Sequence, residues 1–449
     1  MSNTIRIKRG LDIHLQGIAE KVVKVVELRQ YALKPEDFNG VFPKMLVSVG
    51  DKVKAGSSIF FDKYRENIKF SAPVSGTVTE IVRGEKRKLL EVRIESDEHD
   101  EYLDFGAAEP LNLSKEEITH KLLESGAWSL IKQRPYNIIA NPEDNPKAIF
   151  ISAFDSSPLA GDMDFMLEGK SQEFQKGLDA LSKLTTGKIN LNINEKKTNS
   201  QIFTLAKNVE INSFSGPHPA GNVGIQIHHI CPINKGEIVW TIDPQAVVVI
   251  GRLFLEGRFN TEKIIALVGS EVIKPQYYKV KIGASIKNII KDNVREGDVR
   301  FISGNVLTGR KIDKASYLSY YDNMISIIPE GHYQSFFGWL VPNPKKHSFY
   351  RTAFSWLTPN KSYRLDTNIN GGERSFVVTG YLEKVLPMDI YPVHLLKAIM
   401  IEDIDKMENL GIYEVDEEDF ALCEYISTSK INMQAIIRDG LDLIRKEMS

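Results

Sequence analysis

Short apolar runs separated by glycine and proline dominate the first part of the chain. Val22–Val26, Leu46–Val49 and Thr77–Val82 have the composition of strands, and Gly50-Asp51 and Pro73–Gly76 have that of turns. Short strands with such regular interruptions are typical of a small β sandwich or barrel rather than of a parallel sheet.

Strands and helices alternate in the next part of the chain. Ser114 and Glu117 form the capping-box pattern at the start of a predicted helix. We interpret Ala148–Ala153 as a buried strand, Thr198–Val209 as a helix and Ala246–Ile250 as a further buried strand. This alternation predicts a doubly wound α/β domain.

A smaller unit and then a helical region complete the pattern. Tyr277–Gly283 and Asp298–Gly304 are predicted strands, and Ser285 is expected to cap a helix between them over 286–293. This order in a short stretch favours a β-grasp module. Farther on helical patterns prevail, and Met433–Lys446 carries an apolar stripe on one face.

Composition excludes several classes of protein. The net charge of −2 over 449 residues argues against a nucleic-acid partner, which usually requires a basic excess. The two cysteines, Cys231 and Cys423, are too few for a disulfide framework, a four-cysteine zinc site or a cubane iron–sulfur cluster. No apolar run approaches the ~18 residues of a spanning helix, and the first ten residues have no signal-peptide character.

Glycine, histidine and cysteine residues offer only weak site candidates. Gly216–Gly224 could wrap a ligand, but its two prolines remove amide donors, so a rigid structural loop is the stronger interpretation. Neighbouring His228 and His229 on a strand would point to opposite faces. We therefore expect one buried and one exposed histidine beside a buried Cys231, rather than a metal site. Cys423 is expected to be a small core residue.

Three further segments have a functional and a structural interpretation. Asp155 ends a predicted strand, where α/β sheets bind ligands, although the following Ser156-Ser157-Pro158 equally fits a turn stabilised by the aspartate. The run Asp416–Asp419 is most simply a solvated helix start. The aromatic cluster Phe336–Trp339 favours core packing over a ligand pocket.

Two segments resemble a biotinyl/lipoyl-type barrel-sandwich module. They are Val47–Gly56 and Ser71–Val78, and in such carrier domains a lysine lies on the hairpin between them. Lys63 occupies that interval, but its neighbours Asp62 and Tyr64 do not match a carrier site. This resemblance implies the barrel-sandwich fold and does not imply the carrier function.

The whole chain resembles the A subunit of the bacterial sodium-translocating NADH:quinone oxidoreductase. The resemblance rests on motifs whose order and spacing fit along the length: Ile7–Ile13, Glu124–Leu130, Ile151–Asp155, Leu184–Lys188, Gly216–Gly221, Gly251–Leu255, Ile302–Leu307, Phe337–Trp339 and Asp416–Cys423. It implies a multidomain α/β protein in four parts: a barrel-sandwich hybrid at 1–105, a Rossmann-like domain at 106–260, an SLBB-like β-grasp module at 261–330 and a mainly helical part at 331–449.

The chain is more distantly similar to NADH- and flavin-binding subunits of respiratory dehydrogenases. This similarity suggests that the flavin cradle and the iron–sulfur ligands of those subunits have been lost here. The loop that cradles flavin in those proteins corresponds to Gly126–Arg134 here, where a single glycine and the bulky Trp128 would obstruct the approach of a phosphate. Near the C-terminus only Cys423 is available, and a cluster needs four thiolates. The cysteine count likewise excludes a C-type subunit of the ferredoxin:NAD reductase.

The resemblance implies a peripheral subunit on the cytoplasmic face of the bacterial inner membrane. Its partners would be five other subunits, above all a membrane-embedded flavin subunit. NADH, FAD, FMN, riboflavin and iron centres would act in those subunits, which pass electrons to ubiquinone or menaquinone while sodium is exported. This subunit would hold no cofactor, metal or catalytic residue and would contribute to quinone binding. A pure assembly scaffold is the alternative.

A quinone head needs aromatic walls and one or two hydrogen-bond donors. The segment 35–45, which we expect not to form a regular strand, supplies Phe38, Phe42 and Met45. The degenerate flavin loop supplies Trp128 as a wall, with Lys132 or Arg134 as donor. Ordinary packing is the alternative for the three aromatic residues.

Overall fold

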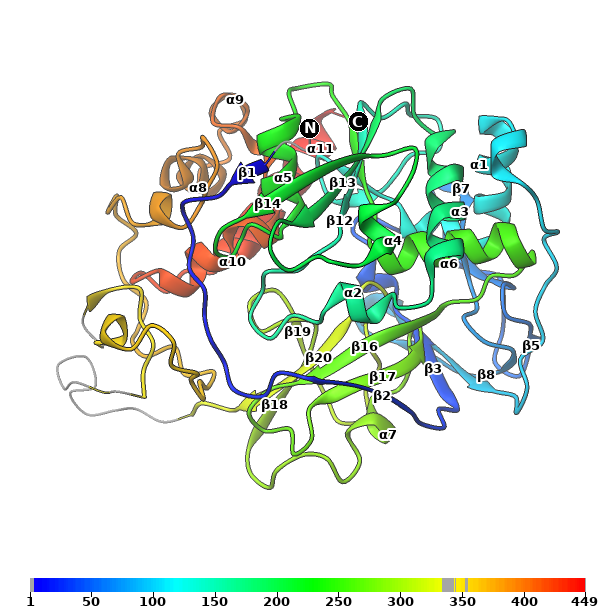
Figure 1. Ribbon diagram of the computed structural model, residues 1–449, viewed down its shortest axis with the longest axis horizontal. Coiled ribbons are helices and arrows are strands. Elements are labelled where there is room, and N and C mark those ends of the chain that lie inside the picture. The colour runs from blue at the N-terminus through cyan, green and yellow to red at the C-terminus, as the bar shows by residue number, and fades with distance from the viewer. Residues whose placement is uncertain (1–3, 333–342, 344, 352–353, 449) are drawn as a thin grey trace.

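The computed structural model describes residues 4–332, 343, 345–351 and 354–448 (Figure 1). The predicted aromatic cluster Phe336–Trp339 lies outside these residues. In the part of the chain that is described, no helix has the length and apolar character needed to cross a bilayer.

The barrel-sandwich part consists of two small sheets. One has the order β3 (Gln30–Leu33), β9 (Leu89–Ser96), β8 (Gly76–Arg83), β5 (Lys52–Val53), and the other has the order β4 (Pro43–Met45), β6 (Ser58–Asp62), β7 (Arg65–Ser71). Phe60 and Phe70 stack in its core with ring centroids 4.6 Å apart. The segment 35–45 thus ends in a short strand, contrary to expectation, because β4 pairs with β6.

The Rossmann-like part has a seven-stranded sheet. Its order is β1 (Thr4–Arg6), β14 (Glu210–Ser215), β13 (Lys188–Asn194), β12 (Ala148–Ser152), β15 (Val239–Thr241), β10 (Lys132–Arg134), β11 (Ile138–Ile139). The first five strands are parallel, and β10 and β11 extend the sheet antiparallel. Its helices are α1 (Lys115–Ser125), α2 (Met163–Met166), α3 (Ser171–Ser182), α4 (Gln201–Thr204), α5 (Val223–Ile230) and α6 (Pro244–Glu256).

Local sequence signals account for some of these helices. The predicted capping box of α1 is present, because Ser114 Oγ accepts from the Glu117 amide and the Glu117 carboxylate accepts from the Ser114 amide. By contrast, Ala246–Ile250 is not a strand but part of α6, which Asp243 caps at its start. A short apolar run cannot by itself distinguish a buried helix from a buried strand. The helix predicted over Thr198–Val209 is reduced to the single turn of α4.

Gly251 lets α6 pack closely on α3. A Cβ at this position would lie 1.7 Å from the carbonyl oxygen of Glu173, so only glycine fits. Almost every residue of α6 is consequently buried, which explains the apolar run Ala246–Ile250.

The β-grasp part has a six-stranded sheet and one short helix. The strand order is β19 (Arg310–Ile312), β18 (Val299–Ser303), β20 (Met324–Pro329), β16 (Glu262–Val268), β17 (Gln276–Lys281), β2 (Glu20–Val25). The helix α7 (Lys287–Ile290) is shorter than predicted.

The N-terminal segment contributes strands to the sheets of two later parts of the chain. Strand β1 pairs with β14 of the Rossmann-like sheet, and β2 pairs with β17 of the β-grasp sheet. These two strands therefore lie in the sheets of the two later parts, and Figure 1 shows this segment (blue) running along both. The sequence of a short strand can indicate that a strand forms, but it does not indicate which other strand it pairs with.

The helices predicted toward the end of the chain are present. The helices of this region are α8 (Pro392–Met400), α9 (Ile404–Asn409), α10 (Glu417–Ile426) and α11 (Met433–Met448). The apolar stripe of α11, which includes Ile437, Leu441 and Ile444, is buried. Figure 1 shows these helices (orange to red) beside α5 and the β1–β14 edge of the Rossmann-like sheet.

Candidate functional site

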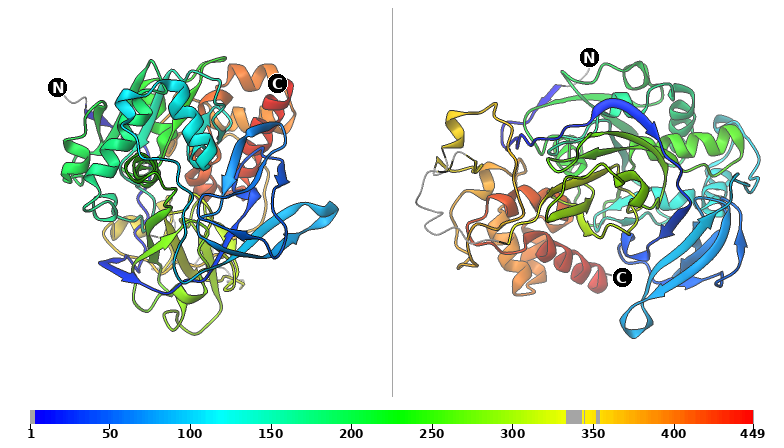
Figure 2. Two further views of the ribbon diagram at one scale, coloured as in Figure 1. Left: turned by 90° about the vertical axis from the view of Figure 1, so that its right-hand side faces the viewer. Right: turned by 90° about the horizontal axis from the view of Figure 1, so that it is seen from below.

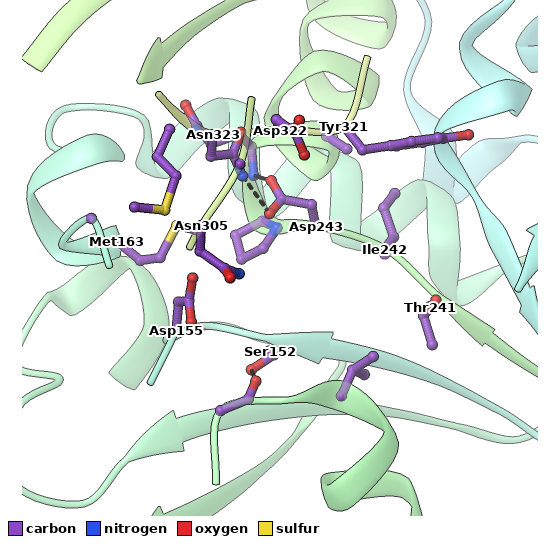
Figure 3. Close-up of a pocket in the computed structure, with 18 of the residues that line it drawn as sticks. Ser152, Asp155, Met163, Thr241, Ile242, Asp243, Asn305, Tyr321, Asp322 and Asn323 are labelled. Carbon is purple, nitrogen blue, oxygen red and sulfur yellow. Dashed lines mark hydrogen bonds between the residues drawn. The ribbon is translucent and has the colours of Figure 1, made fainter. Parts of the chain in front are cut away.

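A pocket of about 300 Å³ lies at the carboxyl ends of β12 and β15. The sheet continues from β12 to β13 and β14 on one side, whereas the parallel strand β15 lies on the other, so the strand order reverses at this pair. Ligands of open α/β sheets bind outside such a reversal. Segments 304–308 and 320–324 of the β-grasp part form the facing wall, and Figure 3 shows Asp322 and Asn323 across the cavity from Ser152 and Asp155.

The lining combines apolar walls with polar groups. The apolar side chains include Phe154, Met163, Met166, Ile242, Ala246, Val249 and Leu307. The polar ones include Lys132, Asp155, His218, Asn222, Asp243, Lys263, Asn305, Asp322, Asn323 and Glu418. This mixture is typical of sites for small organic molecules with a few polar atoms.

Lys132 is the one cation of this lining whose ammonium has no hydrogen-bond acceptor among the described residues. Strand β10 places its Nζ 4.0 Å from the centroid of the Tyr321 ring, a cation–π contact. The Tyr321 hydroxyl is engaged elsewhere, since it donates to the Ser129 carbonyl at 2.7 Å. Loss of water on burial lowers the pKa of Lys132. Its N–H groups can therefore donate to a ligand.

The other deeply buried charges of the pocket have protein partners. Lys263 Nζ donates to the carbonyl oxygens of Tyr320 and Asp322 at 3.2 and 2.7 Å, and burial lowers the pKa of Lys263 to about 8. Asp243 accepts from Asn323 Nδ2 at 2.8 Å, the bond drawn in Figure 3, and burial raises its pKa. These groups fix the β-grasp wall against the start of α6 and are not free to bind a ligand.

Asp155 stabilises a turn and also lines the pocket. Its carboxylate accepts from the Ser157 amide at 2.7 Å and from the Ser157 hydroxyl at 2.9 Å, which is the turn that the following serines predicted. It also lines the pocket. The turn holds the carboxylate at the end of β12, where it faces the cavity.

The loop Gly216–Gly224 has the features of a rigid structural loop. The His218 amide donates to Asp12 Oδ1 at 2.9 Å, and the Gly221 amide donates to Ser156 Oγ at 2.8 Å. A Cβ on Gly221 would lie 2.5 Å from the Ser156 amide nitrogen, so the loop is packed directly on the turn after β12. The amides of His218, Ala220, Gly221 and Asn222 are thus engaged within the protein and are not free to cradle an anion.

The degenerate flavin loop is filled by its own side chains. Trp128 lies in the 3₁₀ turn η4 (Ala127–Leu130), is 0% exposed, and donates from Nε1 to the Ala140 carbonyl at 2.8 Å. Its ring packs edge to face against Trp240. A Cβ on Gly126 would lie 2.4 Å from Ser71 Oγ, so the backbone of the loop is also closely covered. Trp128 is therefore a core residue and is not part of the pocket lining.

Arg134 is held in a buried ion cluster. Its Nη2 lies 2.8 Å from Glu418 Oε1 and 3.1 Å from Asp416 Oδ2. The prediction that Asp416–Asp419 is a solvated helix start is wrong, since Asp416 and Asp419 are 2% and 1% exposed. The cause is tertiary: the start of α10 packs against β10, whose arginine compensates the acidic charge. These carboxylates compensate the charge of Arg134, although its Nε and Nη1 make no hydrogen bond within the described residues, and the side chain is not part of the pocket lining.

The remaining quinone candidates lie on the barrel-sandwich part. Phe38 is buried and contacts the rings of Phe70 and Tyr320, with centroids 4.4 and 4.8 Å apart. Phe42 is 55% exposed and packs edge to face on Tyr64, and Met45 is half-buried. Of this segment, only Phe42 and Met45 could contact a ligand without rearrangement of the core.

The histidine–cysteine segment differs from its prediction. His228 and His229 lie on helix α5 rather than on a strand, and Cys231 is half-exposed rather than buried. His228 Nδ1 lies 2.7 Å from Glu414 Oε2 and its Nε2 accepts from the Asp389 amide. Within the described ranges, no three His, Cys, Asp or Glu side chains are placed to hold a metal ion. Cys423 is buried, as predicted.

Sequence reasoning identified Lys132 and Asp155 but missed the wall that faces them. Tyr321 and Lys263 come from the β-grasp part and lie in no quoted motif, whereas Asn305 lies in Ile302–Leu307, which served only for the family resemblance. Ligands of α/β sheets are expected where the strand order reverses, and this expectation was the only available signal. It would have identified these residues only together with knowledge of which part of the chain covers that edge.

Three family models match consecutive parts of the chain. They are described as the NqrA N-terminal barrel-sandwich hybrid domain, over residues 5–97, the NqrA second alpha/beta domain, over 113–259, and the NQRA C-terminal domain, over 264–314. The A subunit of the Na(+)-translocating NADH-quinone reductase of Neisseria meningitidis serogroup A is 40% identical over 449 residues, which cover 99% of this chain and 100% of that protein. The chain belongs to this family.

Other members of the same family match over the same length. The protein of Hahella chejuensis is 37% identical over 447 residues, and that of Yersinia pestis is 38% identical over 450 residues; each match covers 99% of this chain and 100% of the relative. Among solved structures, an NAD+-reducing [NiFe]-hydrogenase in the H2-reduced state is 12% identical with a TM-score of 0.36, over 50% of this chain and 49% of that one, which is too low to carry an argument.

Proposed function

We propose that the chain is the peripheral A subunit of a sodium-translocating NADH:quinone reductase on the cytoplasmic face of the bacterial inner membrane. The full-length match to proteins of that name supports membership of the complex. Five other subunits would be its partners, including a membrane-embedded flavin subunit. The complex as a whole would transfer electrons from NADH to quinone and export sodium.

Within the complex, this protein binds the head group of a quinone in the pocket between β12, β15 and the β-grasp part. The observation that carries this proposal is the Lys132 ammonium, which lies on the Tyr321 ring without a hydrogen-bond acceptor among the described residues. A quinone is a flat ring with two carbonyl acceptors, so it requires donors between apolar walls. Lys132 and Asn305 supply the donors, and Met163 and Leu307 belong to the apolar walls.

The chain does not carry flavin in this proposal. In the loop Gly126–Arg134 the Ser129 and Ile131 amides donate to carbonyls of the same turn, and the Trp128 ring fills the space beside them. A phosphate cradle needs free amides and an open approach for the ligand. FAD, FMN, riboflavin and the iron centres would therefore act in the partner subunits.

Two alternatives remain to be distinguished. Phe42 and Met45 could form a surface site for the quinone head, because Phe42 is exposed beside Tyr64. The chain could also be an assembly scaffold without a ligand site, in which case the pocket would be a by-product of the ancestral α/β fold.

Titration of the isolated chain with a short-chain ubiquinone, and separately with a short-chain menaquinone, tests the proposal. Isothermal titration calorimetry should show saturable binding of one molecule per chain to at least one of them. Absence of saturable binding for both would favour the scaffold. No membrane is needed, because the head group rather than the isoprenoid tail is the recognised part.

A further inference from the structure

A second surface, remote in sequence from the pocket, combines positive charge with exposed aromatic rings. Residues 331–365 contain no Asp or Glu, although the chain as a whole has 59 among 449 residues. The same stretch contains five basic residues, Lys345, Lys346, Arg351, Lys361 and Arg364. Arg364 pairs with Glu271 of the β-grasp part, so its charge is partly compensated. The segment nevertheless carries a clear positive excess along the chain.

Three large apolar side chains are exposed at the centre of the segment. Phe354 is 46% exposed, Trp356 is 52% exposed and Leu357 is 60% exposed. Trp356 and Leu357 lie in the 3₁₀ turn η6 (Ser355–Leu357). Single exposed apolar residues are ordinary on a protein surface, but a cluster of this size in one turn indicates an interaction site. We call residues 354–357 the aromatic turn.

The turn is anchored to the body of the protein by polar contacts. Ser355 is buried, and its hydroxyl donates to the Ser348 carbonyl at 2.9 Å. The Tyr350 hydroxyl donates to the Ile426 carbonyl at 2.8 Å, and the Tyr363 amide donates to the His14 carbonyl at 2.8 Å. The apolar side chains are thus presented outward by a fixed backbone and are not exposed by fraying.

Basic groups lie directly beside the exposed rings. The Arg351 guanidinium is 5.3 Å from the centroid of the Trp356 ring, and both side chains are exposed. A tryptophan beside a cation is an arrangement that favours the headgroup layer of a bilayer. There the ring takes an interfacial position while long basic side chains reach the phosphates.

We propose that the aromatic turn, with Arg351 and Lys345, docks on the surface of a bilayer that contains anionic phospholipids. Charge complementarity identifies the occupant, because the exposed Arg351 and Lys345 lie in a stretch that has no Asp or Glu between Glu330 and Asp366, and such a stretch fits a negatively charged surface. Figure 1 and the right-hand view of Figure 2 place this segment (gold) at an outer edge of the molecule, where a plane can approach it. The proposal is independent of the quinone pocket.

Vesicle co-sedimentation of the full chain tests it. Vesicles of phosphatidylglycerol mixed with phosphatidylcholine are compared with vesicles of phosphatidylcholine alone. The parent chain should bind the former and lose binding as salt is added. The double variant Trp356→Ser, Leu357→Ser should bind at least about tenfold more weakly, since both side chains lose apolar burial. Arg351→Ala should bind about fivefold more weakly, as expected for one basic residue near an anionic surface.

The matched control removes one apolar and one basic side chain elsewhere. Leu205 is 66% exposed and Lys207 is exposed as well, so Leu205→Ser, Lys207→Ala should sediment like the parent chain. The thermal midpoints of all variants should agree, because each replaced side chain is exposed. Equal vesicle binding by the control and the aromatic-turn variants would overturn the proposal. So would failure of the parent chain to bind anionic vesicles, which would assign the turn to a protein partner instead.

Discussion

The guanidinium of Arg134 on β10 lies 3.1 Å from the carboxylate of Asp416 at the start of α10, and both side chains are almost completely buried. This ion pair joins the Rossmann-like sheet to the C-terminal helices. Glu418 and Asp419 add further acidic charge around the same arginine. Burial by itself would raise the pKa of Asp416, but the positive charge of Arg134 lowers it.

Replacement of the arginine should destabilise the protein strongly. Arg134→Met leaves the buried carboxylates of Asp416 and Asp419 without their cation, which should reduce the free energy of unfolding by about 3–5 kcal/mol. Urea denaturation measures the change. The control is Arg29→Met, because the Arg29–Glu27 pair is exposed and should contribute little. Equal stability of the two variants would contradict this account of the cluster.

Glu417 should make stability depend on pH. Burial and the neighbouring Asp416 raise its pKa from 4.5 to about 9. The folded chain then holds a proton that the unfolded chain releases, so stability should fall as pH rises from about 5 to about 9. Glu417→Gln should flatten this dependence of the thermal midpoint, whereas Glu98→Gln, at an exposed position, should leave it as in the parent chain. A parent-like slope for Glu417→Gln would show that the group titrates normally.

Trp128 should act as a core residue. Trp128→Ala removes a fully buried indole and its hydrogen bond to the Ala140 carbonyl, which should cost about 3–5 kcal/mol of the free energy of unfolding. The matched variant Trp356→Ala, at a half-exposed position, should leave the thermal midpoint nearly unchanged. If Trp128→Ala melts like the parent chain, the turn η4 is not the packed element described here.

Phe42→Ala distinguishes the two candidate quinone segments. The side chain is largely exposed, so the variant should fold with a parent-like thermal midpoint. Its affinity for a short-chain quinone should also equal that of the parent chain, because the pocket lies elsewhere. A clear loss of affinity in this variant would move the site to the surface formed by Phe42 and Met45.

Local sequence signals predicted what local forces determine. The capping box at Ser114 and the apolar stripe of α11 are both present because each depends on residues a few positions apart. The family resemblance supplied the order of the domains. The buried strand predicted at Ala246–Ile250 failed because packing of α6 against α3 buries an entire helix, and that burial is set by residues far away in the sequence.

The site was only partly predictable for the same reason. Asp155 follows from the α/β pattern, since it ends a strand at the edge where ligands bind, whereas Lys132 was proposed from the resemblance to flavin-binding relatives. Tyr321 could be recognised as a pocket residue only from the structure, which places the β-grasp part over that edge. Arg134 was proposed as a ligand donor and Asp416–Asp419 as a solvated helix start, and only their contact across the fold reveals the buried ion cluster.

The central claim is that Lys132 donates to a quinone in the pocket, and quinone affinity of the Lys132→Met variant tests it most directly. Loss of a charge-assisted hydrogen bond of about 1.5–3 kcal/mol should raise the dissociation constant by roughly 10- to 100-fold. The control is Lys384→Met, because Lys384 lies 4.6 Å from the Tyr381 ring centroid in a similar cation–π pair that is not part of the pocket lining. The account predicts weakened binding for Lys132→Met and parent-like binding for Lys384→Met. Equal affinity of Lys132→Met and the parent chain would contradict it.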